Sequence, residues 1–356
     1  MSDVATRLTP ACKPSIILAE PLASIGPEAD WPLSVKKGKN LTFAGGSSIV
    51  GIRPIAVFTS PCFHAAMSSA GTHETELLIV GGGPAGMMAG LLFARAGCRV
   101  RVIEKHADFL RDFRGDTVHP STMEILHQLG MLERFLEHPH SRVDRAEIRI
   151  AGRDWVIGDL SKLDTPAPFI VFMPRWEFLD FLRQEASKYV GFSLLMEAPV
   201  ESFIQEEGRV VGVSLLGGVA ERVRLTIAAD GRSSIVRRTN MLPVQTLGAP
   251  MDILWFRVGK TSNSGGVLRG SFDRGRLVVL IDREDYWQCA LVIPKGGIKT
   301  LKARGLEHVR DLIAASAPDL DLGEIDGFED FHLLNVSLDR LTRWHRPGLL
   351  GFRLCP

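Results

Sequence analysis

An α/β fold with a parallel sheet and a second, β-rich domain is the fold class that this sequence predicts. The first observation is a short apolar run, ELLIV, followed by a glycine-rich loop, a helical segment and another strand within residues 76–104. The second is the alternation of helix-like and strand-like segments up to residue 229. The third is a strand-rich stretch over residues 245–295. Because a strand buried on both faces is apolar throughout, we expect a parallel sheet covered by helices.

Composition and charge exclude several classes of protein. The chain has 356 residues, enough for two domains. Lys+Arg (42) and Asp+Glu (41) nearly cancel, so the charge offers no basis for binding nucleic acid. No run of about 18 apolar residues occurs, so we expect no integral membrane association. The five cysteines are scattered without a CxxC pair, which favours a reducing, cytoplasmic location and predicts no metal site.

The segment LLIVGGGPAGMMAGLLFARAGCRVRVIEK, residues 77–105, has the order strand, glycine-rich loop, helix, strand. Gly81 permits a tight turn, Gly83 lets the backbone approach a pyrophosphate, and Gly86 allows the helix to pack closely on the strand. Pro84 suits the first helical turn, where its missing N–H costs little. The pattern predicts a Rossmann-type dinucleotide site with the pyrophosphate at the helix N-terminus.

An acidic residue, Glu104, ends the second strand of this unit and is followed by Lys105. A carboxylate at this place accepts hydrogen bonds from ribose hydroxyls. It also repels a 2′-phosphate, so the site suits FAD or NAD rather than NADP. The alternative interpretation is a surface loop of small residues followed by an exposed glutamate.

Further elements follow along the chain. A helix is predicted after RGDTVHP, with Ser121 and Glu124 at capping-box spacing. Residues 145–160 alternate as a strand pair does, and residues 174–189 form an amphipathic helix. Three strand-like runs over residues 192–229 predict a β-meander next to the parallel sheet.

The segment LTIAADGRSSIVRR, residues 225–238, follows a strand and precedes a short helix. Together with the glycine-rich start, it makes the chain resemble the flavoprotein aromatic hydroxylases, the class A monooxygenases related to para-hydroxybenzoate hydroxylase. The resemblance covers roughly residues 74–350. It implies that Asp230 and Gly231 lie near the pyrophosphates of FAD and of incoming NAD(P)H. By spacing alone, Asp-Gly is only a turn signal.

Two arginines and two tryptophans lie in other segments similar to this family. In FRGDTVHPSTMEIL, the resemblance implies that Arg114 reaches the flavin side; alone it would be a solvated loop charge. In MPRWEFLDFL, Arg175 stands where the family often has a glutamine that contacts FAD, and arginine can still donate to a phosphate. Trp255 and Trp287 could line a pocket, although packing in the core is the favoured interpretation of each.

The predicted cofactor-binding residues are Gly81, Gly83, Pro84, Ala85, Gly86, Glu104, Lys105, Arg114, Arg175, Asp230 and Gly231. No side chain is assigned as a catalytic acid or base. His119, which precedes Pro120, is interpreted as structural.

Composition, strand pattern and the resemblance together predict a domain organisation. Residues 1–72 form a poorly ordered N-terminal extension, within which Met67 is a candidate natural start. Residues 73–245 form the FAD-binding domain, with 141–172 contributing to the substrate side, and residues 246–335 form an inserted β-rich substrate domain. Residues 336–356 return incompletely to the FAD domain. Where the family continues into Gly-Asp and a helix, this chain reads GFRLCP, so we expect a C-terminal truncation, with a natural short variant as the alternative.

The function implied by the resemblance is that of an FAD-dependent monooxygenase. Such an enzyme reduces FAD with NAD(P)H and uses a flavin C4a-hydroperoxide to hydroxylate a small aromatic or polyketide-like substrate. One alternative is a truncated, catalytically silent relative that binds FAD or only its ADP half. Another is an NAD-dependent dehydrogenase, which the Asp230–Gly231 segment and the inserted domain disfavour. The substrate, the choice between NADH and NADPH, and the oligomeric state stay open.

Overall fold

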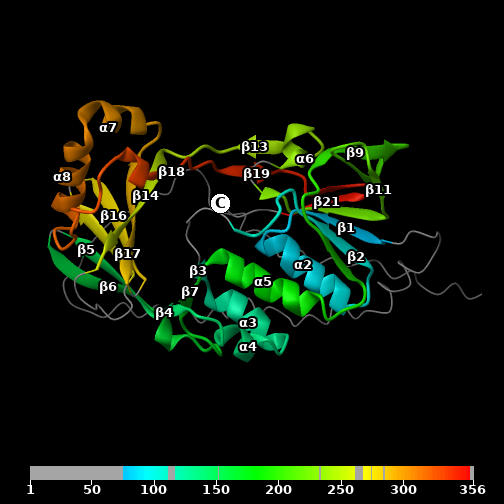
Figure 1. Ribbon diagram of the computed structural model, residues 1–356, viewed down its shortest axis with the longest axis horizontal. Coiled ribbons are helices and arrows are strands. Elements are labelled where there is room, and N and C mark those ends of the chain that lie inside the picture. The colour runs from blue at the N-terminus through cyan, green and yellow to red at the C-terminus, as the bar shows by residue number, and fades with distance from the viewer. Residues whose placement is uncertain are drawn as a thin grey trace, which may run out of the picture. The chain divides into compact units, whose positions relative to one another are not determined.

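The computed structural model describes residues 75–110, 117–150, 152–231, 234–260, 268–273, 275–283 and 285–352 (Figure 1). The predicted N-terminal extension, residues 1–72, lies outside these residues, as does Arg114.

The first half of the described chain, together with its last strands, contains the following elements. They are β1 (Leu77–Val80), α2 (Pro84–Arg95), β2 (Val100–Ile103), β3 (Thr117–Val118), α3 (Pro120–Gln128), α4 (Leu132–Leu136), β4 (Ser141–Val143), β7 (Ile170–Phe172), α5 (Arg175–Ala186), β8 (Phe192–Leu195), β9 (Val200–Glu206), β10 (Arg209–Leu215), β11 (Ala220–Arg222), β12 (Leu225–Ala228), α6 (Ile235–Arg238), β20 (His345–Arg346) and β21 (Leu349–Gly351).

The remaining elements belong to the β-rich part and its connections. They are β5 (Arg145–Ile150), β6 (Arg153–Asp159), η2 (Leu160–Lys162), β13 (Val244–Thr246), β14 (Met251–Gly259), β15 (Leu268–Asp273), β16 (Arg276–Asp282), β17 (Tyr286–Pro294), α7 (Ile298–Arg304), α8 (Leu306–Ser316), η4 (Phe328–Asp330), β18 (His332–Leu334) and β19 (Asp339–Leu341).

A six-stranded sheet in the order β20-β21-β12-β1-β2-β8 carries the glycine-rich segment. Its strands from β21 to β8 are parallel, and β1 lies at the centre, where Ile79 is level with Val102 on β2 and Ile227 on β12. All four residues of β1 are buried, which explains its continuous apolar sequence. The predicted α/β fold class is confirmed by this arrangement.

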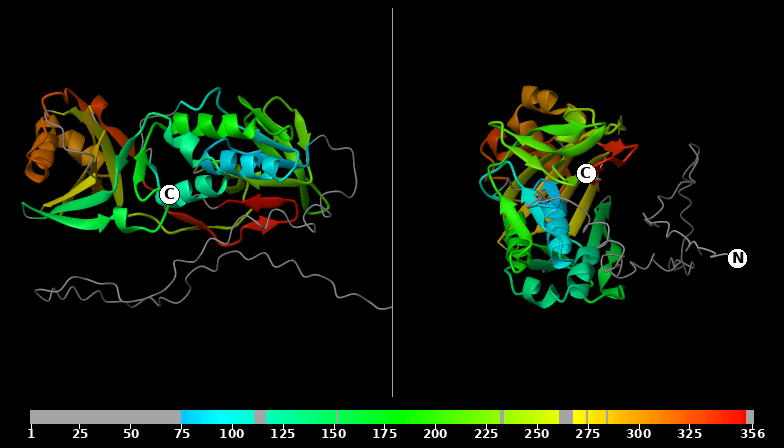
Figure 2. Two further views of the ribbon diagram at one scale, coloured as in Figure 1. Left: turned by 90° about the horizontal axis from the view of Figure 1, so that it is seen from below. Right: turned by 90° about the vertical axis from the view of Figure 1, so that its right-hand side faces the viewer.

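Each face of this sheet has its own core. Leu77 and Ile79 pack with the apolar residues of α2, α3, α4 and α5. Leu78 and Val80, which point the other way, pack with the antiparallel sheet β11-β10-β9 and with α6. The parallel sheet therefore lies between a helical layer and a small β-meander (Figures 1 and 2).

A seven-stranded sheet has the order β18-β14-β17-β16-β15-β5-β6, so the predicted hairpin over residues 145–160 joins strands from much later in the chain. One of its faces packs on α7 and α8, and Trp287 lies with that cluster. Trp255 packs on the opposite face with Phe172 of β7 and Ile281. Both tryptophans thus take part in packing.

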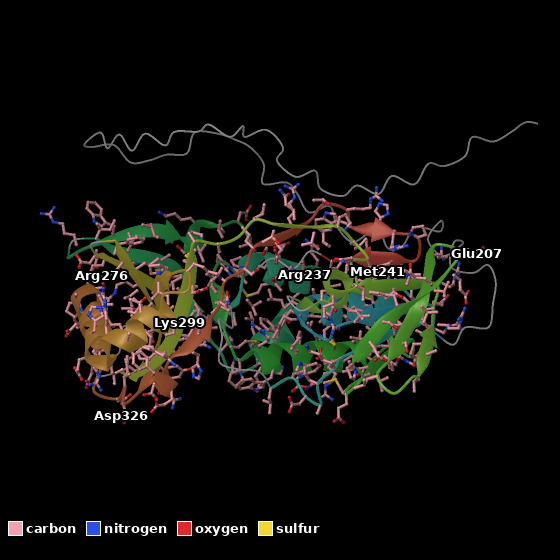
Figure 3. The ribbon with its side chains drawn as sticks, turned by 90° about the horizontal axis from the view of Figure 1, so that it is seen from above. Glu207, Arg237, Met241, Arg276, Lys299 and Asp326 are labelled. Atoms are coloured by element: carbon pink, nitrogen blue, oxygen red, sulfur yellow. The ribbon has the colours of Figure 1, made fainter. Side chains whose placement is uncertain are left out.

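The chain enters the seven-stranded sheet through β13 and leaves it through β19. These two connecting strands pair antiparallel. Arg237 of α6, which is labelled in Figure 3, pairs with Asp339 of β19 at 2.6 Å between Nη1 and Oδ2. At the start of β14, the buried Asp252 accepts hydrogen bonds from Lys295 Nζ, Gly296 N and Val336 N. These bonds fix the ends of β14, β17 and β18 to one another.

The capping box predicted at Ser121 is wrong. Helix α3 begins at Pro120, and its N-cap is His119, which has extended backbone angles and makes no side-chain cap. The physical reason is that a residue before proline avoids the helical region, whereas proline itself suits the first helical position. Among the described residues, no helix has both the length and the hydropathy needed to cross a bilayer.

Candidate functional site

A cavity of about 700 Å³ lies where the carboxyl ends of β1, β2 and β12 meet. In an open α/β sheet, this edge is where ligands bind. Its lining includes eight of the predicted residues: Gly81, Gly83, Pro84, Glu104, Lys105, Arg175, Asp230 and Gly231. Ala85 and Gly86 belong to the first turn of α2 behind this lining, and Arg114 lies outside the described residues.

The glycines of the loop have different spatial roles. Gly81 has φ +107°, and a Cβ there would lie 2.5 Å from the carbonyl oxygen of Ala229. A Cβ on Gly86 would lie 1.9 Å from the carbonyl oxygen of Gly81. At Gly83, in contrast, no atom of the described residues lies within 4 Å of the position of a Cβ. Gly81 and Gly86 therefore permit close backbone packing, while Gly83 leaves open space beside the cavity.

Glu104 follows β2 and is nearly buried, with 8% of its surface exposed. Its Oε2 accepts a hydrogen bond from Gly82 N at 2.8 Å, and its Oε1 accepts one from His106 N at 3.2 Å. The ring Nε2 of His106 lies 3.8 Å from Oε1. These contacts orient the carboxylate at the cavity wall.

Asp230 follows β12 and faces the glycine-rich loop from the neighbouring strand. Its Oδ2 accepts a hydrogen bond from Ile235 N at 2.6 Å, at the start of α6. Its Oδ1 is buried and has no hydrogen-bond partner within the part of the chain that the structure describes. A buried acceptor without a partner is costly, and such groups occur where a ligand completes the site.

Helix α2 points its N-terminus at the cavity. Its N-cap is Gly83, and no side chain caps its first N–H groups. Uncapped N–H groups and the helix dipole favour an anion at this end. Arg175, the first residue of α5, also lines the cavity and contributes a positive charge.

Other lining residues were not predicted from the sequence: His106, Ala198, Pro199, Val200, Glu201, Leu216, Ile235 and Arg238. His106 could have been found because it lies two residues beyond Glu104 in the same loop. Arg238 lies in the quoted segment after Asp230. Ile235 lies in the same quoted segment, at the start of α6. The others come from the β8–β9 connection, the start of β9 and the residue after β10, and no motif marks them.

The arrangement has the donors and acceptors that a dinucleotide requires. A carboxylate able to accept from ribose hydroxyls, a helix N-terminus able to bind a pyrophosphate and an arginine all line the same cavity. The open space at Gly83 and the unpaired Asp230 Oδ1 fit a bound group that approaches the backbone closely. Within the described ranges, no cluster of three or more His, Cys, Asp or Glu residues could hold a metal ion.

The comparisons with known proteins agree with this geometry. The model of the family described as "FAD binding domain" matches residues 74–269. The chain is 30% identical over 289 residues to 6-methylpretetramide 4-monooxygenase of Streptomyces rimosus, covering 79% of this chain and 68% of that protein. It is 29% identical over 175 residues to rifampicin monooxygenase of Streptomyces venezuelae, covering 49% of this chain and only 35% of that protein.

Among solved structures, the fold is similar to that of PqsL, a probable FAD-dependent monooxygenase from Pseudomonas aeruginosa. The TM-score is 0.64 at 20% identity, and the match covers 78% of this chain and 77% of that one. At this identity the likeness concerns the fold alone.

Proposed function

Because this chain belongs to the family of FAD-dependent aromatic monooxygenases, we propose that it binds FAD in the cavity at the end of β1 and hydroxylates an aromatic or polyketide-type substrate. The observation that carries the proposal is the collection of Gly83, Glu104 and Asp230 around one cavity. The names of the related enzymes, which include a 6-methylpretetramide monooxygenase, support this substrate class.

The residues of the cavity have distinct roles in this proposal. Glu104, already oriented by Gly82 N, accepts hydrogen bonds from the ribose of the ADP half. The first turn of α2, over Pro84, Ala85 and Gly86, presents its positive end to the pyrophosphate. Arg175 and Lys105 add positive charge to the lining of the cavity.

Asp230 and Gly231, which follow β12, line the cavity from the strand next to β1. Asp230 Oδ2 is fixed by Ile235 N, so the unpaired Oδ1 keeps a constant position from which it can accept a hydrogen bond. Gly231 has φ +79°, which turns the chain away at this point and leaves room for the bound group. The apolar side chains of Ile103 and Ile235 also line the cavity.

When bound, FAD supplies the redox chemistry that activates O₂. The overall reaction takes a hydride from NADH or NADPH and one proton, transfers one oxygen atom of O₂ to the substrate, and releases the other as water. The protein's own contribution is to position and to shield, because the cavity provides hydrogen bonds and charge rather than an acid–base pair.

An FAD titration of the purified chain tests the proposal, with quenching of flavin fluorescence as the readout. We expect saturable binding with which ADP competes. Oxygen consumption is then measured with NADH or NADPH, using 6-methylpretetramide and resorcinol as the polyketide and small aromatic probes.

Oxygen consumption accompanied by a product heavier by one oxygen atom supports the proposal. Binding of FAD without consumption of either nicotinamide supports the silent relative instead. Absence of FAD binding contradicts both.

A further inference from the structure

Gln288 of β17 is buried in the seven-stranded sheet without a hydrogen-bond partner. In the described strands of this sheet, the buried polar side chains are those of Asp252, Ser271, Asp282 and Gln288. Gln288 is the least exposed of them, at 1%. Neither Nε2 nor Oε1 of its amide has a partner within the described part of the chain. Because the burial of an unpaired amide lowers stability, such a group requires an explanation.

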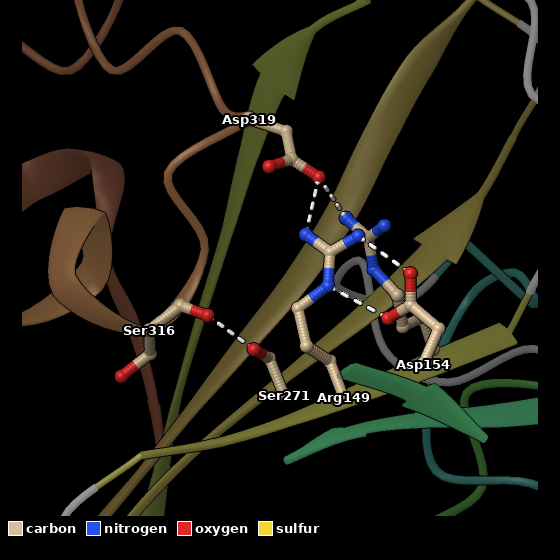
Figure 4. A network of polar contacts seen from close by, with 6 residues as sticks. Arg149, Asp154, Ser271, Ser316 and Asp319 are labelled. Atoms are coloured by element: carbon tan, nitrogen blue, oxygen red, sulfur yellow. Dashed lines mark hydrogen bonds and ion pairs between the residues drawn. The ribbon is translucent and has the colours of Figure 1, made fainter. Parts of the chain in front are cut away.

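The other buried polar side chains of this sheet are paired by the fold itself. Asp252 accepts the three hydrogen bonds given above. Asp282 pairs with Lys260 Nζ at 2.5 Å. Ser271 donates its hydroxyl to the carbonyl oxygen of Ser316, at the end of α8 (Figure 4). The glutamine amide is therefore the exception in this set.

The amide lies on the face of the sheet that is turned away from α7 and α8. Gln288 is level with Ile281 on β16, and Ala290, two residues further along β17, is level with Trp255 on β14. Side chains two residues apart in a strand share a face. These four side chains therefore lie together, whereas Cys289 points to the other face and packs in the core formed with the two helices.

The indole of Trp255 provides a second unpaired donor on the same face. Its ring packs with Phe172 and Ile281, but its Nε1 is buried and no described residue accepts from it. Diagonal neighbours on adjacent antiparallel strands lie within reach of aromatic and long side chains. Together, Gln288 and Trp255 offer donors at Nε2 and Nε1 and an acceptor at Oε1.

These groups are complementary to a primary carboxamide. The carbonyl oxygen of a carboxamide has two lone pairs, which can accept from Gln288 Nε2 and Trp255 Nε1. Its N–H can donate to Gln288 Oε1, so the two amides pair edge to edge through parallel hydrogen bonds. A single hydroxyl oxygen cannot meet Nε2 and Oε1 of one amide with good geometry at once, because the N–H and C=O point in parallel directions.

The segment after β7 connects this face of the sheet with the FAD cavity. Phe172, which packs with Trp255, ends β7, and Arg175 lines the cavity three residues later. Three residues span at most about 11 Å. A substrate held against this face is therefore close to the cavity, although Gln288 itself is not among the residues that line it.

We propose that Gln288, assisted by Trp255, is a specificity-determining residue that selects an aromatic substrate carrying a primary carboxamide. The inference rests on the proposed function, because it names a polar group of the substrate of that same enzyme. A site whose buried polar groups are left unpaired by an analogue rejects that analogue strongly. An amide that lacks partners in the free protein and gains them from the substrate has this property.

Equilibrium dialysis of the chain with excess FAD tests the selectivity without turnover. The probes are 3-hydroxy-2-naphthamide, the methyl ketone of the same ring, which keeps the carbonyl oxygen but lacks the N–H, and 2-naphthol. The wild type should bind the carboxamide about tenfold or more tightly than either analogue. Equal affinities overturn the proposal, and so does the absence of carboxamide binding up to the limit of its solubility.

Gln288→Met keeps the length of the side chain and removes both polar atoms. It should weaken binding of the carboxamide about tenfold and change binding of 2-naphthol by less than about twofold. Its melting temperature should equal or exceed that of the wild type, because an apolar group replaces an unpaired buried amide. A residue that served only the fold would not combine these two results.

The matched control is Ser271→Ala, on the other face of the same sheet. It leaves the carbonyl oxygen of Ser316 unpaired, so it should lower the melting temperature and leave carboxamide binding unchanged. If Gln288→Met keeps the selectivity of the wild type, or if its melting temperature falls as far as that of Ser271→Ala, the amide serves the fold and the proposal is wrong.

An FAD titration separates failure of this inference from failure of the proposed function. Gln288→Met should bind FAD as the wild type does, because Gln288 is not among the lining residues of the cavity. A wild type that binds FAD and consumes oxygen, but does not prefer the carboxamide, refutes the inference and leaves the function. A wild type that binds no FAD, yet prefers the carboxamide through Gln288, refutes the function and supports the carboxamide site.

Discussion

Gly82 donates its backbone N–H to Glu104 Oε2 at 2.8 Å, so the acid that follows β2 stabilises the glycine-rich loop that follows β1. The two residues lie just beyond the carboxyl ends of the neighbouring parallel strands β1 and β2. The same carboxylate accepts a second hydrogen bond from His106 N. Glu104 therefore supports the shape of the loop in addition to its proposed contact with the ribose of FAD.

Replacement of this acid should weaken FAD binding. Glu104→Ala removes the acceptor of Gly82 N and the proposed acceptor of the ribose hydroxyls. Because a hydrogen bond to a charged group contributes about 1.5–3 kcal/mol, the affinity for FAD should fall roughly 10- to 100-fold. Fluorescence titration measures the change, and Glu133→Ala, on the exposed surface of α4, is the control. Equal affinities of the two variants would refute the role of Glu104.

Substitutions of two loop glycines should separate an effect on the stability of the fold from an effect on FAD affinity. Gly81→Ala combines a positive φ with a Cβ 2.5 Å from Ala229 O, so it should lower the free energy of unfolding by about 1–3 kcal/mol. The new Cβ of Gly83→Ala has no atom of the described chain within 4 Å, so this substitution should leave stability nearly unchanged. Its methyl group instead obstructs a ligand, so FAD affinity should fall. Thermal unfolding and FAD titration of both variants check this; similar melting temperatures would contradict it.

The buried Asp252 should make stability depend on pH. The pKa of its carboxyl lies below the ordinary value of 3.8, first because Gly296 N donates to it and then because Lys295 pairs with it. A lowered pKa in the folded state means that the stabilisation is complete above about pH 4 and is lost as the pH falls through the folded pKa. Asp252→Asn should therefore cost about 1–3 kcal/mol at pH 7, and the difference should shrink in acid.

Urea unfolding of Asp252→Asn and the wild type at pH 7, 5, 4 and 3 measures this difference. Asp311→Asn, on the exposed side of α8, serves as the control and should have little effect at any pH. A cost for Asp252→Asn that stays constant down to pH 3 would show that the charge of this carboxyl is not the cause.

Two cysteines of the described chain should be unreactive in the folded protein. Cys98 and Cys289 are buried, and burial raises the pKa of both thiols. Because the thiolate is the nucleophile, iodoacetamide at pH 8 should label neither until the chain unfolds. Mass spectrometry of the peptides that contain them, with and without urea, gives the result. Native labelling of Cys289 at the unfolded rate would contradict its burial.

The local part of the site could be predicted because its determinants lie close together in the sequence. Gly81, Gly83 and Gly86 act within one loop and one helical turn, and the apolar run of β1 reports burial on both faces. The capping prediction at Ser121 was wrong although it too was local. There, capping-box spacing competed with the backbone restriction that Pro120 imposes on His119, and the restriction prevailed.

Other walls of the cavity could not be predicted, because the residues that form them carry no motif. Pro199 and Leu216 reach the cavity only because β9 and β10 fold back over the sheet. Likewise, nothing in the sequence of β5 and β6 indicates that β5 pairs with β15, more than a hundred residues later. Such pairings depend on which edges remain open after the rest of the chain has folded.

By itself, the sequence determined the strand–loop–helix–strand unit, the residues that could bind a dinucleotide, and the family. Only the tertiary structure decided that Asp230 stands opposite Gly81, with one oxygen that no described residue pairs with, and that RDWVIGD lies at the edge of the described sheet. The physical reason is that turn geometry and helix capping act between near neighbours in the chain. Strand order and burial, in contrast, arise from contacts between distant segments, which local sequence patterns do not encode.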